Sequence, residues 1–215
     1  MALQIKLFQF NAFQENTFVI WDNYKNCVII DPGCYSTQEQ NEFIDFIIKN
    51  ELRPCALLNT HAHIDHVLGN DFIKKNFNID YYLHQDDIMT LESIDSYAHL
   101  YGFEGYSSSP KPNYFLFHNQ KMIFGEIEFT VYHTPGHSPG HVVFYFEKDG
   151  FVINGDVLFK GSFGRVDLPG GNIEILKKSI LEVMFMLPEE TIVYCGHGPE
   201  TNIQTEKKSN YIHQF

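Results

Sequence analysis

The stretch His61-Ala-His-Ile-Asp-His66 decides the fold, because it places four groups able to bind a metal within six positions. It directly follows the apolar run at residues 55–60, which is bounded by Pro54 and predicted to be a short buried strand. The hexapeptide therefore opens the loop at the C-terminal end of that strand, where rigid scaffolds usually present chemistry.

The spacing within the hexapeptide suggests two metals. His61 and His63 form a His-x-His pair that can converge on one ion from an extended loop. Asp65 and His66 follow too closely to share that ion comfortably, which suggests a second metal beside the first. Imidazole and carboxylate suit zinc, iron or manganese. The alternative is a surface loop that is histidine-rich by chance, since the chain contains 11 histidines in 215 residues.

Length and composition predict one globular domain over residues 1–215, since a domain usually has about 150 residues. The hydrophobic fraction is 44% and the charged fraction 20%, which exclude a disordered chain. No apolar run approaches the ~20 residues of a membrane span, and the N-terminus alternates polar and apolar residues, unlike a signal peptide. We therefore expect a cytoplasmic protein without a membrane partner.

Charge and cysteine content exclude further classes. The net charge of −12 argues against a nucleic-acid partner, because nucleic-acid binders need basic faces. The four cysteines include no C-x-x-C pair, so neither a disulfide framework nor a thiolate zinc knuckle is expected. A small-molecule substrate is the expected partner, and the oligomeric state is not predicted.

The order of expected elements favours two β-rich layers with helices outside. Strands are expected at residues 4–10, 17–21, 27–30, 55–60, 81–84, 121–124, 127–133, 142–147, 151–154 and 191–195, and helices at 38–52, 70–77 and 173–187. Residues 90–114 mix aromatic side chains with Gly, Ser and Pro. They are either a plain surface excursion or an aromatic lid beside the active site.

Three further residues share the placement of the hexapeptide. His137, Asp156 and His197 each lie just after an expected strand and close to a glycine, which lets the backbone turn sharply. Four such loops are the layout expected of a metal centre built on a β-scaffold. A carboxylate at Asp156 is suited to bridge two cations, because each of its oxygens can take one.

These motifs resemble the metallo-β-lactamase-fold hydrolases, and within them the hydroxyacylglutathione hydrolase (glyoxalase II) branch. The resemblance runs from Asp31-Pro-Gly through the hexapeptide, the run at 134–141 and Gly155-Asp156 to the Gly-rich segment at 161–167. It implies an α+β fold, a four-layer αβ/βα sandwich. It differs from true β-lactamases, where a cysteine ligand would be expected at the position of Asp156.

The resemblance also implies the ligand set. One metal would take His61, His63 and His137, and the other Asp65, His66 and His197, with Asp156 and a hydroxide bridging them. Two divalent ions are implied, zinc first, with iron or manganese as alternatives. Around them, His141 is expected to support a ligand or the loop by a hydrogen bond. Asp31 either bonds a metal-binding histidine or caps its own turn.

The predicted activity is metal-dependent cleavage of an acyl bond, foremost a thioester, by the bridging hydroxide. Asp65 is a catalytic candidate because it can orient the nucleophile. The glyoxalase II segment that binds glutathione is replaced here by one carrying Arg165 and Asp167, and the chain resembles a short form without the C-terminal glutathione-binding extension. Recognition of glutathione is therefore left open, although Arg165 can pair with a substrate carboxylate.

Other activities stay open. Gly164-Arg-x-Asp167 is similar to persulfide dioxygenases of the same superfamily, which use a single iron, and this is the second candidate. A lactonase, a nuclease and a non-catalytic metal-binding module rank lower. The binding module ranks low because structural zinc sites are closed and usually rich in cysteine.

Overall fold

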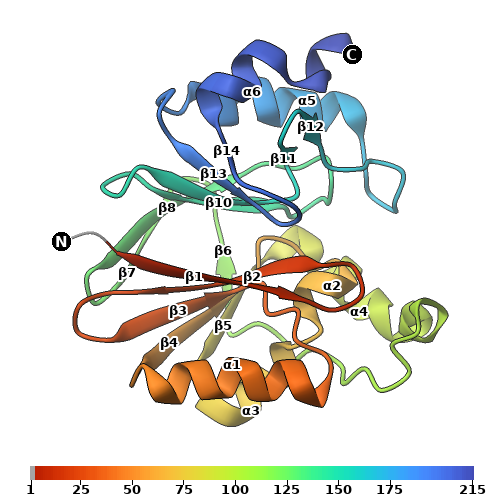
Figure 1. The fold of residues 1–215 in the computed structure, drawn as a ribbon. Helices are drawn as coiled ribbons and strands as arrows, with labels where there is room; N and C mark the ends of the chain where they lie inside the picture. Colours follow the sequence, from red (N-terminus) through yellow and green to blue (C-terminus); the bar gives the residue numbers. More distant parts are fainter. Residues whose placement is uncertain (1–2) are drawn as a thin grey trace.

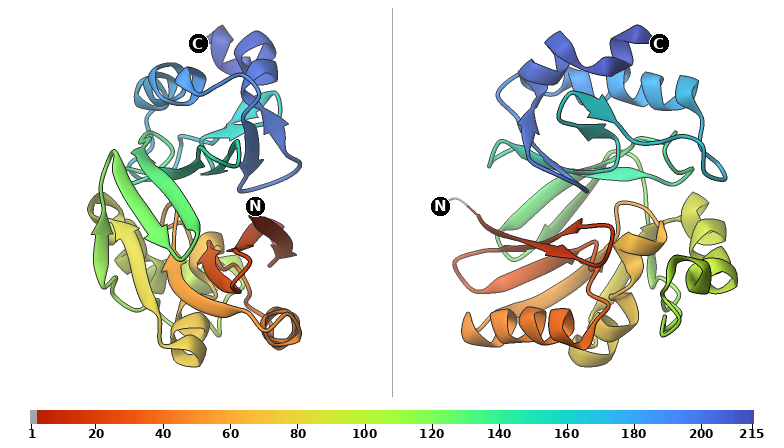
Figure 2. Two further views of the ribbon diagram at one scale, coloured as in Figure 1. Left: turned by 90° about the vertical axis from the view of Figure 1, so that its left-hand side faces the viewer. Right: turned by 45° about the vertical axis from the view of Figure 1, so that its right-hand side comes forward.

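Two six-stranded β-sheets face each other, and helices cover the outer face of each sheet (Figure 1). The computed structural model describes residues 3–215. The arrangement is the predicted αβ/βα sandwich of the α+β class, with the N-terminal half of the chain in one pair of layers and the C-terminal half in the other (Figure 2).

The first sheet has the order β1-β2-β3-β4-β5-β6. Its strands are β1 (Gln4–Phe10), β2 (Glu15–Trp21), β3 (Asn26–Ile30), β4 (Arg53–Leu58), β5 (Asp80–His84) and β6 (Tyr114–Leu116). The pairs from β3 to β6 are parallel, so each needs a crossover segment. The crossovers carry α1 (Thr37–Lys49), α2 (Ile64–Val67), α3 (Asn70–Phe77) and α4 (Ile88–Tyr97).

The second sheet has the order β14-β13-β10-β9-β8-β7. Its strands are β7 (Gln120–Phe124), β8 (Ile127–His133), β9 (Val142–Phe146), β10 (Phe151–Gly155), β13 (Ile192–Cys195) and β14 (Thr201–Asn202), and its outer face carries α5 (Ile173–Glu182) and α6 (Ile203–Ser209). A small hairpin of β11 (Leu158–Phe159) and β12 (Ser162–Phe163) follows β10.

Three apolar cores hold the four layers together. The middle core lies between the sheets and includes Phe18 and Leu58 from the first sheet and Phe129 and Phe144 from the second. One outer core packs helices such as α1 on the first sheet. The other packs α5 and α6 on the second sheet. Strands at the centre of each sheet are therefore covered on both faces, as β2 and β10 are along their whole length.

Shortening a side chain in the middle core is expected to destabilise the protein. Leu58 is 0% exposed, and Leu58→Ala should lower the free energy of unfolding by about 2–5 kcal/mol through lost burial and a residual cavity. Ile48 on α1 is 67% exposed, and Ile48→Ala should change the free energy of unfolding by no more than about 0.5 kcal/mol. Urea denaturation of the metal-free proteins measures both, and equal effects would contradict the proposed position of the core.

Several boundaries differ from those expected from the sequence. The strand expected at 55–60 is β4, which begins at Arg53, ends at Leu58 and contains Pro54. Pro54 is tolerated because the pairing of β4 with β3 shifts register beside it, at Cys27 and Val28. The helix expected at 38–52 ends at Lys49, because Glu51 has φ 55°, which is outside the helical region.

Short elements were missed. The helices α2 and α6 and the strands β6, β11, β12 and β14 were not expected, because runs of two to seven residues carry little periodicity, and the helix α4 was not expected either. The helix expected at 173–187 ends at Glu182 and continues after one residue as a 3₁₀ turn, Met184–Met186. Among residues 3–215, every helix is too short or too polar to cross a membrane.

Candidate metal centre

The strand ends bring the seven predicted ligands to one edge of the sandwich. The loop after β4 carries His61 and His63, and α2 carries Asp65 and His66. The loop between β8 and β9 carries His137, and the turns after β10 and β13 carry Asp156 and His197. The short helix α2 was not expected, and the ring of His66 on it packs against that of His61 with centroids 4.1 Å apart.

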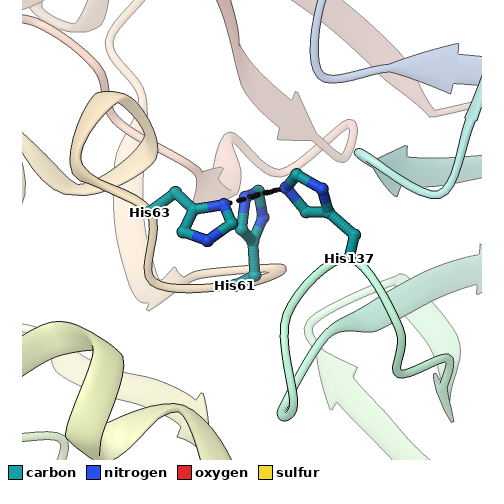
Figure 3. A group of neighbouring side chains, drawn as sticks. All are labelled: His61, His63 and His137. Carbon is teal, nitrogen blue, oxygen red and sulfur yellow. Dashed lines mark hydrogen bonds between the residues drawn. The ribbon is translucent and has the colours of Figure 1, made fainter. Parts of the chain in front are cut away.

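The first group consists of three histidines whose ring nitrogens converge (Figure 3). His137 Nε2 lies 2.8 Å from His63 Nδ1 and 3.2 Å from His61 Nε2. All three side chains are buried or nearly so. Burial, together with neighbouring histidines, lowers the pKa of His61 well below 6.5 and that of His63 to about 3, so both rings are neutral at pH 7.

The hydrogen bonds of these rings show that two lone pairs face each other. His137 Nδ1 donates to the carbonyl of Arg165 at 2.7 Å, and in the neutral ring this tautomer has no proton on Nε2. Thr60 Oγ1 donates to Asp31 at 2.6 Å and therefore accepts from His61 Nδ1 at 3.0 Å, so His61 Nε2 is also bare. Nitrogens sharing a tetrahedral zinc would lie about 3.3 Å apart. The group fits a cation better than it fits a hydrogen bond.

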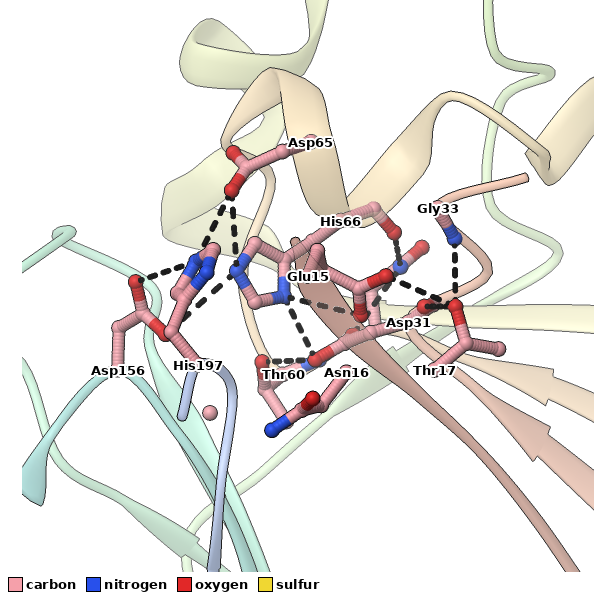
Figure 4. Close-up of polar contacts among 12 residues, drawn as sticks. Glu15, Asn16, Thr17, Asp31, Gly33, Thr60, Asp65, His66, Asp156 and His197 are labelled. Carbon is pink, nitrogen blue, oxygen red and sulfur yellow. Dashed lines mark hydrogen bonds and ion pairs between the residues drawn. The ribbon is translucent and has the colours of Figure 1, made fainter. Parts of the chain in front are cut away.

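The second group consists of Asp65, His66 and His197 (Figure 4). Asp65 Oδ2 lies 3.0 Å from His197 Nε2 and 3.7 Å from His66 Nε2. The far nitrogen of each ring is held in place: His66 Nδ1 donates to Asp31 at 3.1 Å, and His197 Nδ1 donates to the carbonyl of Phe13 at 3.1 Å. Such bonds fix the tautomer and turn Nε2 toward Asp65.

Asp156 lies between the two groups. Its Oδ1 is 3.5 Å from His66 Nε2, and its Oδ2 is 3.5 Å from His137 Nε2 and 3.6 Å from His197 Nε2. Burial opposes ionisation, but the surrounding histidines, His66 first, lower the pKa of Asp156 below 3.8. His66 Nε2 and Asp156 Oδ1 are both buried and have no hydrogen-bond partner within residues 3–215. Unpartnered buried donors and acceptors are costly, and a divalent cation would satisfy both atoms.

The two residues expected around the ligands contact them. Asp31 is buried, and besides His66 it accepts hydrogen bonds from the backbone N–H and the hydroxyl of Thr60 at 2.7 and 2.6 Å. His141 Nε2 accepts the backbone N–H of Asp156 at 3.0 Å. Of the two alternatives for Asp31, the contacts match the bond to a histidine.

Sequence reasoning missed the segment that holds the loop of His197. Asn16 Nδ2 donates to the carbonyls of Cys195 and Gly198, both at 2.9 Å, and its backbone N–H donates to Gly196 at 2.7 Å. Its neighbour Glu15 is fully buried and lies 3.8 Å from His66 Nδ1. The only sequence signal was two polar residues at the start of a buried strand.

Arg165 lies beside the centre, but its side chain points to solvent. The side chain is 61% exposed, and its guanidinium forms a bidentate pair with Asp167, with both contacts at 2.7 Å. The backbone carbonyl of the same residue receives the bond from His137 described above. The predicted role in substrate binding therefore requires this pair to open or rearrange.

The first half of the aromatic stretch at 90–114 forms α4 and a 3₁₀ turn, Ala98–Tyr101, and residues 102–113 are irregular, as expected. Tyr101 packs against Phe13 with ring centroids 5.8 Å apart, and Tyr97 packs on Tyr101 at 5.7 Å. Because the carbonyl of Phe13 holds His197, these rings lie next to the metal centre. Phe13 and Tyr101 are 40% and 49% exposed, so both present apolar surface to solvent.

Comparisons with known proteins place the chain in one family. The model of the "Metallo-beta-lactamase superfamily" matches residues 10–197. The chain is 39% identical over 205 residues to "Probable metallo-hydrolase YqgX" of Bacillus subtilis, covering 94% of this chain and 91% of the relative. It is 34% identical over 209 residues to "Hydroxyacylglutathione hydrolase GloC" of Haemophilus influenzae, covering 97% of each.

Solved structures agree with this placement. "BLEG-1 B3 metallo-beta-lactamase" superposes with a TM-score of 0.87 at 36% identity, covering 97% of this chain and 98% of the other. "TTHA1623 in a di-iron-bound form" superposes with a TM-score of 0.86 at 35% identity, covering 96% and 98%. The fold, the clustered histidines and aspartates and these matches lead to one conclusion: the chain belongs to the metallo-β-lactamase superfamily, a family of metal-dependent hydrolases.

Proposed function

We propose that the protein is a binuclear metal-dependent hydrolase that cleaves an acyl bond, foremost a thioester. The observation that carries this proposal is the position of Asp156, whose two carboxylate oxygens lie between the two groups of ligands. A carboxylate placed in this way can bind two cations at once. The related GloC protein, named as a hydroxyacylglutathione hydrolase, supports thioester chemistry.

The donor set suits two divalent ions, with zinc foremost and iron or manganese as alternatives. His61, His63 and His137 would hold one ion, Asp65, His66 and His197 the other, and Asp156 both. When bound, two such ions lower the pKa of a shared water toward neutrality and polarise a substrate carbonyl. The di-iron form of the similar structure supports a two-metal site and keeps iron among the candidates.

The residues of the chain then orient the reactants. Asp65 contacts both imidazoles through Oδ2, which leaves Oδ1 to accept a hydrogen bond from the attacking water. The side chains of Asp65 and His197 are 14% and 27% exposed, whereas those of His66 and His137 are 0% and 2% exposed, so the substrate would arrive at Asp65 and His197. A thiolate leaves without being protonated, so a thioester requires no separate general acid.

The substrate side of the proposal is a small acyl compound in the cytoplasm, without a nucleic-acid or membrane partner. Phe13 and Tyr101 would contact its apolar part, and Arg165 would pair with a substrate carboxylate in exchange for Asp167. Because Asp167 already neutralises this guanidinium, substrates without a carboxylate are also expected to be accepted.

Removing the aromatic contacts tests this side of the site. Phe13→Ala and Tyr101→Ala are each expected to raise KM for a thioester by about three- to tenfold with kcat little changed, which is the size of one aromatic contact. Tyr24→Ala is the matched control, because Tyr24 is 67% exposed and lies in the turn between β2 and β3. Steady-state kinetics decide the point, and a KM that stays constant in both variants would exclude these rings from the substrate site.

The second candidate is a persulfide dioxygenase with a single iron, which the Gly164-Arg165-x-Asp167 motif favours. A panel of thioesters, lactones, phosphodiesters and β-lactams, run beside oxygen uptake with glutathione persulfide, separates the candidates. We expect thioester hydrolysis without oxygen uptake. Oxygen uptake by protein holding one iron, without hydrolysis of any ester in the panel, would replace our proposal with the dioxygenase.

A further inference from the structure

A buried carboxylate outside the two ligand groups touches both loops that carry the first group. Asp87 ends the 3₁₀ turn Gln85–Asp87 that follows β5, and it is 0% exposed. Within residues 3–215, its side chain accepts three hydrogen bonds, all from the loops at residues 61–63 and 137–140 and none from a basic side chain.

One oxygen of Asp87 holds the loop after β4. Its Oδ2 accepts the backbone N–H of Ala62 at 2.7 Å. Ala62 is the residue between His61 and His63, so this bond fixes the backbone from which both imidazoles project. The side chain of Ala62 is itself buried, which leaves the loop little room to shift.

The other oxygen holds the loop between β8 and β9. Its Oδ1 accepts the backbone N–H of Gly140 at 2.6 Å and the hydroxyl of Ser138. Ser138 directly follows His137, the third member of the first group. The approach is close enough that a Cβ on Gly140 would lie 2.6 Å from the backbone nitrogen of Asp87, so only glycine fits there.

A carboxylate is the group suited to this position, because it accepts on both oxygens and donates on neither when ionised. An asparagine would direct an N–H₂ group at one of the two loops and lose the bond on that side. Asp31 has the corresponding place beside the second group, where it joins His66 to Thr60. Through the hydroxyl of Thr60, Asp31 also reaches His61, whereas Asp87 bonds only to the two loops of the first group within residues 3–215.

We propose that Asp87 is a positioning residue that sets the separation of His137 from His61 and His63, and thereby the affinity of the first metal subsite alone. The inference rests on the proposed metal centre. It predicts that loss of Asp87 lowers the affinity for one of the two metals, whereas a general loss of stability would lower the affinity for both.

The test measures zinc binding by equilibrium dialysis in two single-subsite backgrounds. His197→Ala disables the second subsite, and His137→Ala disables the first. Adding Asp87→Asn is expected to weaken zinc binding by about ten- to hundredfold in the His197→Ala background. In the His137→Ala background it should leave zinc binding within about twofold, and Asp45→Asn, which changes an exposed carboxylate on α1, should leave both unchanged.

The results distinguish a failure of the proposed metal centre from a failure of the role of Asp87. If the wild-type protein does not bind two zinc ions, or the background variants do not each lose one, the proposed centre is wrong. If they do, but Asp87→Asn weakens both subsites equally or neither, the positioning role is wrong. Should Asp87→Asn fail to fold, as judged by circular dichroism, Ser138→Ala removes one of the three bonds and is expected to weaken only the first subsite, by several-fold. Unchanged zinc binding in that variant would also overturn the proposal.

Discussion

Asp65→Ala is expected to lower kcat/KM for thioester hydrolysis by about 10²–10⁴-fold while the protein stays folded. Asp65 Oδ2 lies 3.0 Å from His197 Nε2, and the side chain is on the open side of the centre. Its loss removes both a proposed ligand of the second subsite and the group that orients the attacking water. The assay measures kcat/KM with metal supplied in excess. The decrease then reflects the lost orientation of the water, together with any loss of bound metal that the excess does not restore.

The control for this prediction is Asp45→Ala, which removes an exposed carboxylate from α1, a helix in the outer layer on the first sheet (Figure 1). It should hydrolyse the thioester at the wild-type rate. Circular dichroism and thermal denaturation establish that both variants fold. A folded Asp65→Ala protein with undiminished hydrolysis would remove Asp65 from the reaction and with it the proposed mechanism.

Asp156→Asn is expected to have an effect of similar or greater size. The amide keeps the shape of the side chain but has one oxygen, so it cannot present an anionic oxygen to both groups of ligands. We expect the variant to bind at most one metal per chain and to lose about 10³-fold in kcat/KM, which corresponds to about 4 kcal/mol of activation free energy.

Asp45→Asn again serves as the control, and metal content is measured beside activity for both proteins. Asp156 Oδ1 has no hydrogen-bond partner within the described residues, so the substitution breaks no bond of that oxygen within the chain. If Asp156→Asn binds two metals and keeps its activity, the carboxylate does not bridge, and the two groups of ligands act independently.

The sequence predicted the ligand-bearing loops well because their signal is local. His61, His63, Asp65 and His66 are adjacent in the chain, and the apolar run before them marks a strand whatever the rest of the fold does. The resemblance supplied the pairing of these residues with His137 and His197, and the structure places them within reach of one another. The order of strands and helices predicted two β-rich layers with helices outside, and the resemblance supplied the four-layer sandwich.

What could not be foreseen depends on contacts between distant parts of the chain. Asn16 reaches the carbonyl of Cys195 across 179 residues, and Asp87 reaches Gly140 across 53. The sequence does not indicate either partner, because any buried donor or acceptor could form such a hydrogen bond. The helix α4 was missed for another reason: the breakers that follow it, such as Gly102 and Gly105, made residues 90–114 look irregular throughout.

Metal content is the most direct test of the central claim that two cations share Asp156. Protein purified without added metal is analysed by mass spectrometry for zinc, iron and manganese, and the same sample is assayed for thioester hydrolysis before and after chelation. We predict about two metal ions per chain, loss of hydrolysis when they are removed, and recovery when they are returned. A chain that hydrolyses thioesters equally well with one metal or none would contradict the proposed mechanism.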